Sequence, residues 1–163
     1  MAVVIDQDCA SLVATEGKFP VLVKWLLDKG KIGTSRELRK RYERYPNFLE
    51  DIYDILDDVG RNIRLSPEME DKLEQEVESI QSLCKNKRDD FIVAMMRLAG
   101  FRLIVSNDSA LIDDIRNEKL FNNPRGQCYC RRSKEEGRGQ YRISEHNSSR
   151  SDKLLKDLGH CGD

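Results

Sequence analysis

Short apolar segments place the strongest constraint on the fold of this chain. Residues 2–5 form an unbroken apolar run, and residues 101–105 form a second strongly apolar segment. Runs of this kind are typical of strands that are buried on both faces, as in a parallel sheet. Weaker strand candidates lie at residues 31–33, 62–65 and 127–130.

Helices are expected between these strands, over residues 19–29, 34–45, 48–59, 66–80, 89–99 and shortly after residue 108. Strands that alternate with helices predict an α/β fold. We therefore expect a three-layer α/β/α sandwich with a short, mostly parallel central sheet.

Local signals predict where several helices begin and end. Thr34, with Glu37 three residues later, matches the capping-box pattern. Ser66 followed by Pro67 is a strong helix start, and Gly100 is typical of a helix end. After a cap at Asn47, two helices should turn these apolar residues to the core: Phe48, Leu49, Ile52, Leu56 and Val59 in the first, and Met69, Leu73, Val77 and Ile80 in the second.

The length of 163 residues suits a single domain. We expect that domain to cover residues 1–130, and residues 131–163 to form a polar, basic tail that is partly disordered. The formal charge of the whole chain is −1, so overall charge predicts no particular partner.

Membrane and secreted classes of protein are not expected. The apolar stretches are far shorter than the roughly 20 residues of a spanning helix, and the N-terminus lacks the basic region of a signal peptide. The five cysteines do not form a disulfide framework. Free thiols and a cytoplasmic location are the simpler interpretation.

Acidic residues follow the predicted strands. Asp6 closes the first apolar segment, and Asp108 follows residues 101–105. Glu37 and Asp90 lie in the first turns of two predicted helices. Carboxylates collected at one edge of a parallel sheet would repel one another without a cation, and hard oxygen ligands suit Mg²⁺ or Mn²⁺. Helix capping by Glu37 and a favourable helix-dipole contact by Asp90 are the structural alternatives.

Four segments resemble the motifs of the PIN domain, a family of small metal-dependent ribonucleases found in toxin–antitoxin pairs and RNA processing. They are Val3-Val-Ile-Asp6-Gln-Asp8, Thr34-Ser-Arg-Glu37-Leu38-Arg39, Asp90-Phe-Ile-Val-Ala94 and Leu103-Ile-Val-Ser106-Asn107-Asp108. The last two segments are the most specific, and the match covers about residues 1–130.

The resemblance implies a Mg²⁺ or Mn²⁺ site with three metal-binding carboxylates, Asp6, Asp90 and Asp108, and a fourth catalytic one, Glu37. Ser106 would support them as a hydroxyl. Asp8, which follows Gln7, departs from the family pattern and adds a negative charge as a further supporting residue. Two ambiguities remain open at this stage: Asp89 competes with Asp90, and Glu43 competes with Glu37.

Basic residues surround Glu37 and predict contact with the RNA backbone, although a solvated helix face is the alternative. The candidates are Arg36, Arg39, Lys40 and Arg41. A second basic stretch begins at Arg125 and continues into the tail, where it binds nucleic acid, binds a partner or is simply disordered. Cysteines at 128, 130 and 161 lack the spacing of a zinc knuckle.

The sequence therefore predicts a divalent-metal-dependent endoribonuclease that hydrolyses RNA phosphodiester bonds. A catalytically inactive PIN-like module that binds RNA or protein is the alternative, and a flap-type DNA nuclease is a weaker third. RNA is the expected partner. Two further partners stay as alternatives: an antitoxin or other regulatory protein, and a second copy of the chain in a homodimer.

Overall fold

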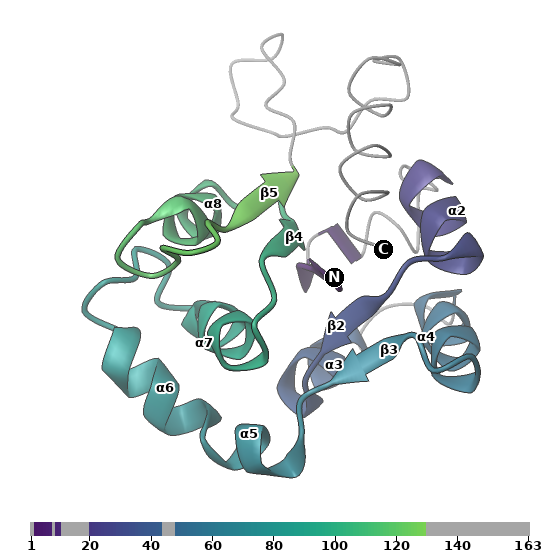
Figure 1. The fold of residues 1–163 in the computed structure, drawn as a ribbon, viewed down its shortest axis with the longest axis horizontal. Helices are drawn as coiled ribbons and strands as arrows, with labels where there is room; N and C mark the ends of the chain where they lie inside the picture. Colours follow the sequence, from purple (N-terminus) through teal and green to yellow (C-terminus); the bar gives the residue numbers. More distant parts are fainter. Residues whose placement is uncertain (1, 8, 11–19, 44–47, 130–163) are drawn as a thin grey trace, which may run out of the picture.

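The computed structural model describes residues 2–7, 9–10, 20–43 and 48–129 (Figure 1). The predicted cap Asn47, the supporting residue Asp8 and the basic tail lie outside these residues. No helix in the described ranges is long and apolar enough to cross a membrane.

The protein has an α/β fold built on one parallel sheet. Its strands are β1 (Val3–Ile5), β2 (Ile32–Thr34), β3 (Asn62–Arg64), β4 (Leu103–Val105) and β5 (Gln127–Tyr129). They are parallel throughout and lie in the order β3-β2-β1-β4-β5. Every residue of the central strands β1 and β4 is buried, as the two strongly apolar segments predict. The fold class is confirmed.

Seven helices connect the strands in the described part of the chain. They are α2 (Pro20–Asp28), α3 (Arg36–Tyr42), α4 (Phe48–Asp58), α5 (Pro67–Asp71), α6 (Leu73–Ile80), α7 (Asp90–Ala99) and α8 (Ser109–Arg116). Right-handed crossovers place the connections on opposite faces of the sheet when the direction of strand addition changes. Accordingly, α2 contacts α4, whereas α7 contacts α6 and α8 (Figure 1). These groups form the outer layers of the sandwich.

Strand order reverses beside β1. The chain adds β2 and β3 on one side of β1, then crosses through α5, α6 and α7 and adds β4 on the other side (Figure 1). Ile5 of β1 is paired with Val105 of β4, so the two strands end side by side. In open α/β sheets, ligands bind at such a switch point, outside the carboxyl ends of the strands.

The helix start predicted at Thr34 is wrong by one residue. Thr34 belongs to β2, and its hydroxyl donates to the side-chain oxygen of Asn62 at 2.8 Å. Ser35 is the cap instead, and its hydroxyl accepts from the Leu38 backbone N–H at 3.2 Å. A sheet contact therefore takes Thr34 away from capping, and Glu37 has no capping-box role.

Two further helix predictions need correction. Val59 lies just beyond the end of α4 and is 52% exposed, and the buried residues described on α4 are Ile52, Tyr53 and Leu56. The predicted helix over residues 66–80 is divided at Lys72 into α5 and α6. Its start at Ser66 and the end of α7 at Gly100, which has a left-handed φ of 71°, are as predicted.

Candidate functional site

The centre of the candidate site is the junction between β1 and β4. Asp6 directly follows β1 and is 3% exposed, and Ser106 directly follows β4 and is fully buried. The Ser106 hydroxyl donates to Asp6 Oδ2 at 2.7 Å and accepts from the Asp108 backbone N–H at 3.0 Å. Ser106 thus links two predicted metal-binding residues across the switch point.

Asp108 has a structural role as well as a place in the site. Its Oδ1 accepts from the backbone N–H groups of Ala110 and Leu111 at 2.7 and 2.9 Å, so it caps α8. Its Oδ2 accepts from the Asn86 side-chain amide at 3.1 Å. The capping contacts fix the carboxylate in one orientation at the strand end.

Asn86 joins the β4 side of the site to the start of α7. Its amide also donates to Asp89 Oδ2 at 3.0 Å, while its carbonyl oxygen accepts from the backbone N–H groups of Arg88 and Asp89. The buried Asp114 of α8 holds this segment by accepting from the backbone N–H groups of Lys85 and Asn86 at 2.7 and 2.8 Å. Neither Asn86 nor Asp114 was predicted from the sequence, because Asp114 contacts backbone groups 28–29 positions away and Asn86 reaches Asp108 22 positions away.

The neighbouring residues Asp89 and Asp90 have different surroundings. Both Asp89 oxygens are engaged, Oδ2 by Asn86 and Oδ1 by Arg41 at 2.8 Å. Asp90 is 7% exposed and forms no ion pair with another described residue. Burial raises the pKa of the Asp90 carboxyl, with a smaller raising effect from Asp89, against lowering effects from the Phe91 N–H, Lys87 and Arg41. Because Arg41 neutralises the Asp89 charge, whereas Asp90 has no such partner among the described residues, these environments favour Asp90 over Asp89 as the predicted ligand.

Glu37 is oriented by Arg41, four residues later on α3. The Arg41 Nε lies 3.4 Å from Glu37 Oε1, and its guanidinium also contacts Asp89 and stacks 4.0 Å from the centre of the Phe91 ring. Arg41 therefore connects α3 to the start of α7. Glu43, the competitor to Glu37, is the exposed C-terminal cap of α3 and does not line the pocket described next.

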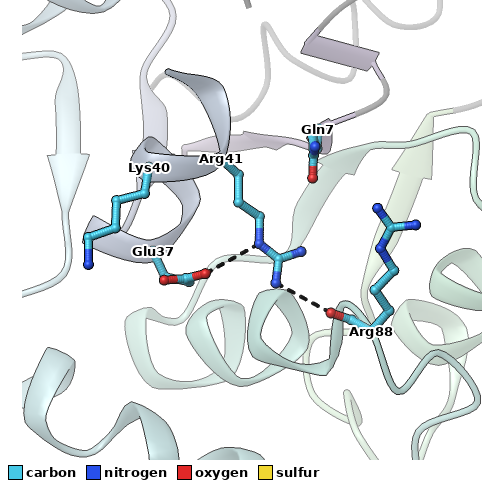
Figure 2. Close-up of a pocket in the computed structure, with 5 residues that line it drawn as sticks. All are labelled: Gln7, Glu37, Lys40, Arg41 and Arg88. Atoms are coloured by element: carbon cyan, nitrogen blue, oxygen red, sulfur yellow. Dashed lines mark hydrogen bonds and ion pairs between the residues drawn. The ribbon is translucent and has the colours of Figure 1, made fainter. Parts of the chain in front are cut away.

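An open pocket of about 360 Å³ lies beside these acids (Figure 2). It is lined by Gln7, Glu37, Lys40, Arg41 and Arg88. Gln7 directly follows Asp6, and Arg88 directly precedes Asp89, so the pocket continues from the acidic edge. Figure 2 shows the Arg41 guanidinium between Glu37 and the backbone oxygen of Arg88.

The predicted RNA-binding residues are only partly brought together. Lys40 and Arg41 line the pocket, whereas Arg36 does not. Arg39 is 3.2 Å from Asp57 and lies over the Tyr53 ring, so its contacts are with α4. Arg88 was missed, although the basic sequence Lys85-Asn-Lys-Arg88 just before two aspartates was a usable signal.

Tyr42 supports the end of β1. Its hydroxyl donates to the Ile5 backbone oxygen, and its ring stacks on Tyr53 with centroids 5.4 Å apart. Burial raises the pKa of the Tyr42 hydroxyl well above its ordinary value, and the nearby Asp6 charge adds to the rise. The group therefore stays protonated and acts as a donor that holds the strand preceding Asp6.

The carboxylates offer the donor atoms that Mg²⁺ prefers, but not a preformed cage. In the described ranges, no three or more Asp, Glu, His or Cys side chains are grouped closely enough to hold a metal ion. Mg²⁺ usually binds through one or two carboxylates together with waters and substrate phosphate oxygens. The residues fit such an ion in donor chemistry, with Asp6 and Asp108 already linked through Ser106.

Comparison with known proteins adds no family assignment: no protein-family model matches the chain, and no curated protein matches its sequence. The fold and the site define an α/β protein with an acidic switch-point edge and an adjoining basic pocket.

Proposed function

We propose that this protein is a divalent-metal-dependent endoribonuclease that hydrolyses RNA phosphodiester bonds. The observation that supports the proposal best is the hydrogen-bonded connection from the Asp6 carboxylate through the Ser106 hydroxyl to the Asp108 backbone N–H at the switch point of the sheet. Acidic groups at this position are suited to substrate-dependent binding of Mg²⁺ or Mn²⁺.

Asp6 and Asp108 would hold the ion, with Asp90 as the third carboxylate. A bound Mg²⁺ or Mn²⁺ lowers the pKa of a coordinated water and stabilises charge on a phosphoryl oxygen. Ser106 keeps Asp6 in place by donating to one of its oxygens. Glu37, which is half-buried and held by Arg41, would complete the acidic group or orient the attacking water.

Cleavage of a labelled RNA by the purified protein tests this proposal. We expect activity with Mg²⁺ or Mn²⁺ and none with a chelator. Asp6→Asn and Asp90→Asn should each reduce the rate by roughly 100-fold or more, since even residues that only support metal ligands often contribute 10- to 100-fold. Asp71→Asn, on an exposed residue at the end of α5, is the matched control and should cleave as the wild type does.

Equal residual activity in the wild type, Asp6→Asn and Asp90→Asn would indicate a contaminating nuclease and overturn the proposal. Matched RNA and DNA strands in the same assay decide between a ribonuclease and the flap-type DNA nuclease, because the 2′-hydroxyl is the feature that distinguishes the two substrates.

A PIN-like module that binds RNA or a protein without cutting is the second candidate. One observation favours it: Arg41 contacts the carboxylates of both Glu37 and Asp89, which reduces the acidic charge available near the pocket. Calorimetric titration with Mn²⁺ separates the two functions. A nuclease should bind Mn²⁺ and lose this binding in Asp6→Asn. A module that only binds RNA or protein should show no Mn²⁺ binding that depends on Asp6.

A further inference from the structure

We propose that the pocket between α3 and the start of α7 binds one phosphate group of the RNA backbone next to the cleaved linkage, with Lys40 and Arg88 as its cationic contacts. This inference rests on the proposed function, and it names the substrate-binding residues of the same site. Lys40 and Arg88 approach the pocket from segments that are 48 positions apart in the sequence.

The charge balance of the pocket supports an anionic ligand. Its lining contains three cations and a single carboxylate, that of Glu37. Arg41 is engaged by Glu37 and Asp89. Lys40 and the Arg88 side chain are exposed and form no ion pair within the described ranges, so two positive charges remain for a ligand.

The contacts of Arg41 distinguish it from these two residues. Its guanidinium donates to Asp89 Oδ1 at 2.8 Å and to the Arg88 backbone oxygen at 3.5 Å. It also stacks over the Phe91 ring, 4.0 Å from the ring centroid. Ligand binding through Arg41 would require these contacts to be broken. We therefore assign Arg41 as a positioning residue that holds Arg88 and Glu37 at the pocket, and not as a phosphate contact.

The position of the pocket indicates which phosphate it would bind. Gln7 lines its wall and is adjacent in sequence to Asp6, while Arg88 is separated from Asp90 by one residue. A strand whose scissile phosphate lies at the acidic edge would therefore place a neighbouring phosphate near Lys40 and Arg88. The volume of about 360 Å³ lies within the range of small-ligand sites.

Salt-dependent binding of a fluorescently labelled single-stranded oligoribonucleotide, measured by anisotropy in chelator so that no cleavage occurs, tests the proposal. Lys40→Ala and Arg88→Ala should each weaken binding about two- to fivefold, as expected for an exposed ion pair. Each should also reduce the slope of log Kd against log salt concentration by about 0.7, because one phosphate contact is lost. Arg88→Lys should retain most of that slope.

Arg39→Ala is the matched control, since it removes one positive charge from the same helix but outside the pocket. If the subsite lies at the pocket, Arg39→Ala should show the same slope of log Kd against log salt concentration as the wild type. Equal effects of Arg39→Ala, Lys40→Ala and Arg88→Ala would instead indicate a diffuse basic surface and overturn the subsite. So would unchanged binding in Lys40→Ala and Arg88→Ala, or binding of an acidic peptide but no RNA. A thermal melt of each variant confirms that it is folded.

The binding assay tests the phosphate subsite and the cleavage assay tests the nuclease function, so either proposal can be overturned without the other. Slope changes confined to Lys40→Ala and Arg88→Ala in a protein that never cleaves RNA would support the subsite and overturn the nuclease. Cleavage with an unchanged KM in both variants would support the nuclease and overturn the subsite.

Discussion

At the scale of single residues, Asp89 and Asp90 show how neighbouring carboxylates can be given different chemical properties by their surroundings. Asp89 is paired with a guanidinium and an amide, whereas Asp90 is buried at the start of α7 without a described ion pair. A buried, weakly compensated carboxylate costs folding free energy and is typical of a functional position. The two residues should therefore respond in opposite directions to removal of their charge.

Asp90→Asn should stabilise the metal-free protein at pH 7. Burial raises the pKa of Asp90 above its ordinary value of 3.8, so the ionised form is disfavoured in the folded state. The free energy of unfolding should therefore rise, because the folded variant no longer bears the cost of burying an ionised carboxylate. Thermal melts of the two proteins at pH 7 measure this difference.

The pH dependence of that difference provides its control. At pH values above the folded-state pKa, the Asp90 charge lowers stability; as the pH falls through this pKa and then toward 3.8, protonation removes the cost. The gap between variant and wild type should therefore shrink with falling pH. A less stable Asp90→Asn variant at pH 7, or a gap that does not change with pH, would contradict this explanation.

Asp89→Asn should destabilise the protein by about 1.5–3 kcal/mol, the usual range for hydrogen bonds to charged groups. The substitution removes the charge opposite Arg41, whose remaining carboxylate contact, to Glu37, is longer at 3.4 Å. Urea unfolding of Asp89→Asn, Arg41→Gln and the double variant measures the coupling between the residues. Additive effects of the two substitutions would show that the ion pair contributes nothing.

At the scale of elements, the segment before α7 depends on a helix that follows it in the sequence. Asp114 of α8 is 1% exposed and accepts from two consecutive backbone N–H groups, those of Lys85 and Asn86. Asn86 then contacts Asp89 and Asp108 on either side of the site. The position of the site residues thus depends on packing between α7 and α8.

Asp114→Asn should cost about 2 kcal/mol of stability, because the amide presents a single oxygen to two backbone donors and leaves one unsatisfied. It should also reduce RNA cleavage, since Asn86 would no longer be held. Asp113→Asn is the matched control: its ion pair with Lys85 is exposed, with side chains 54% and 67% accessible, and should contribute under about 1 kcal/mol. Equal stability and activity of the two variants would contradict the proposed role of Asp114.

Element-level features differ in how well the sequence predicts them. Local signals sufficed for the apolar strands β1 and β4, the Ser66 cap and the Gly100 helix end. The Thr34 cap was wrong because Thr34 and Ser35 are both good capping residues. The choice between them depends on the contact between Thr34 and Asn62, which lies 28 positions away.

The same limit applies to the basic residues of the candidate site. Arg39 and Arg41 lie in one basic run, yet one pairs with Asp57 and the other with Asp89. Helical spacing alone cannot predict these partners, because they belong to other elements. Arg88 lies outside that run and lines the pocket on a segment that Asp114 and Asn86 hold by hydrogen bonds.

At the scale of the whole molecule, the strand order determines where a ligand could bind. The reversal beside β1 brings Asp6 and Asp108 together from positions about 100 residues apart. The sequence predicted that these acids would share an edge, and the structure places them at neighbouring strand ends. Within the described ranges, no three acidic side chains lie close enough together to hold an ion by themselves, so metal binding at this edge is the central question.

A crystal structure of the protein soaked in Mn²⁺, with anomalous diffraction from the metal, tests that question most directly. We predict an anomalous peak within about 2.0–2.3 Å of carboxylate oxygens of Asp6 and Asp108, at a Mn²⁺ concentration that supports RNA cleavage. The peak should be absent in Asp6→Asn. Full cleavage activity with no metal at this edge, or with metal bound only elsewhere, would contradict the proposed site.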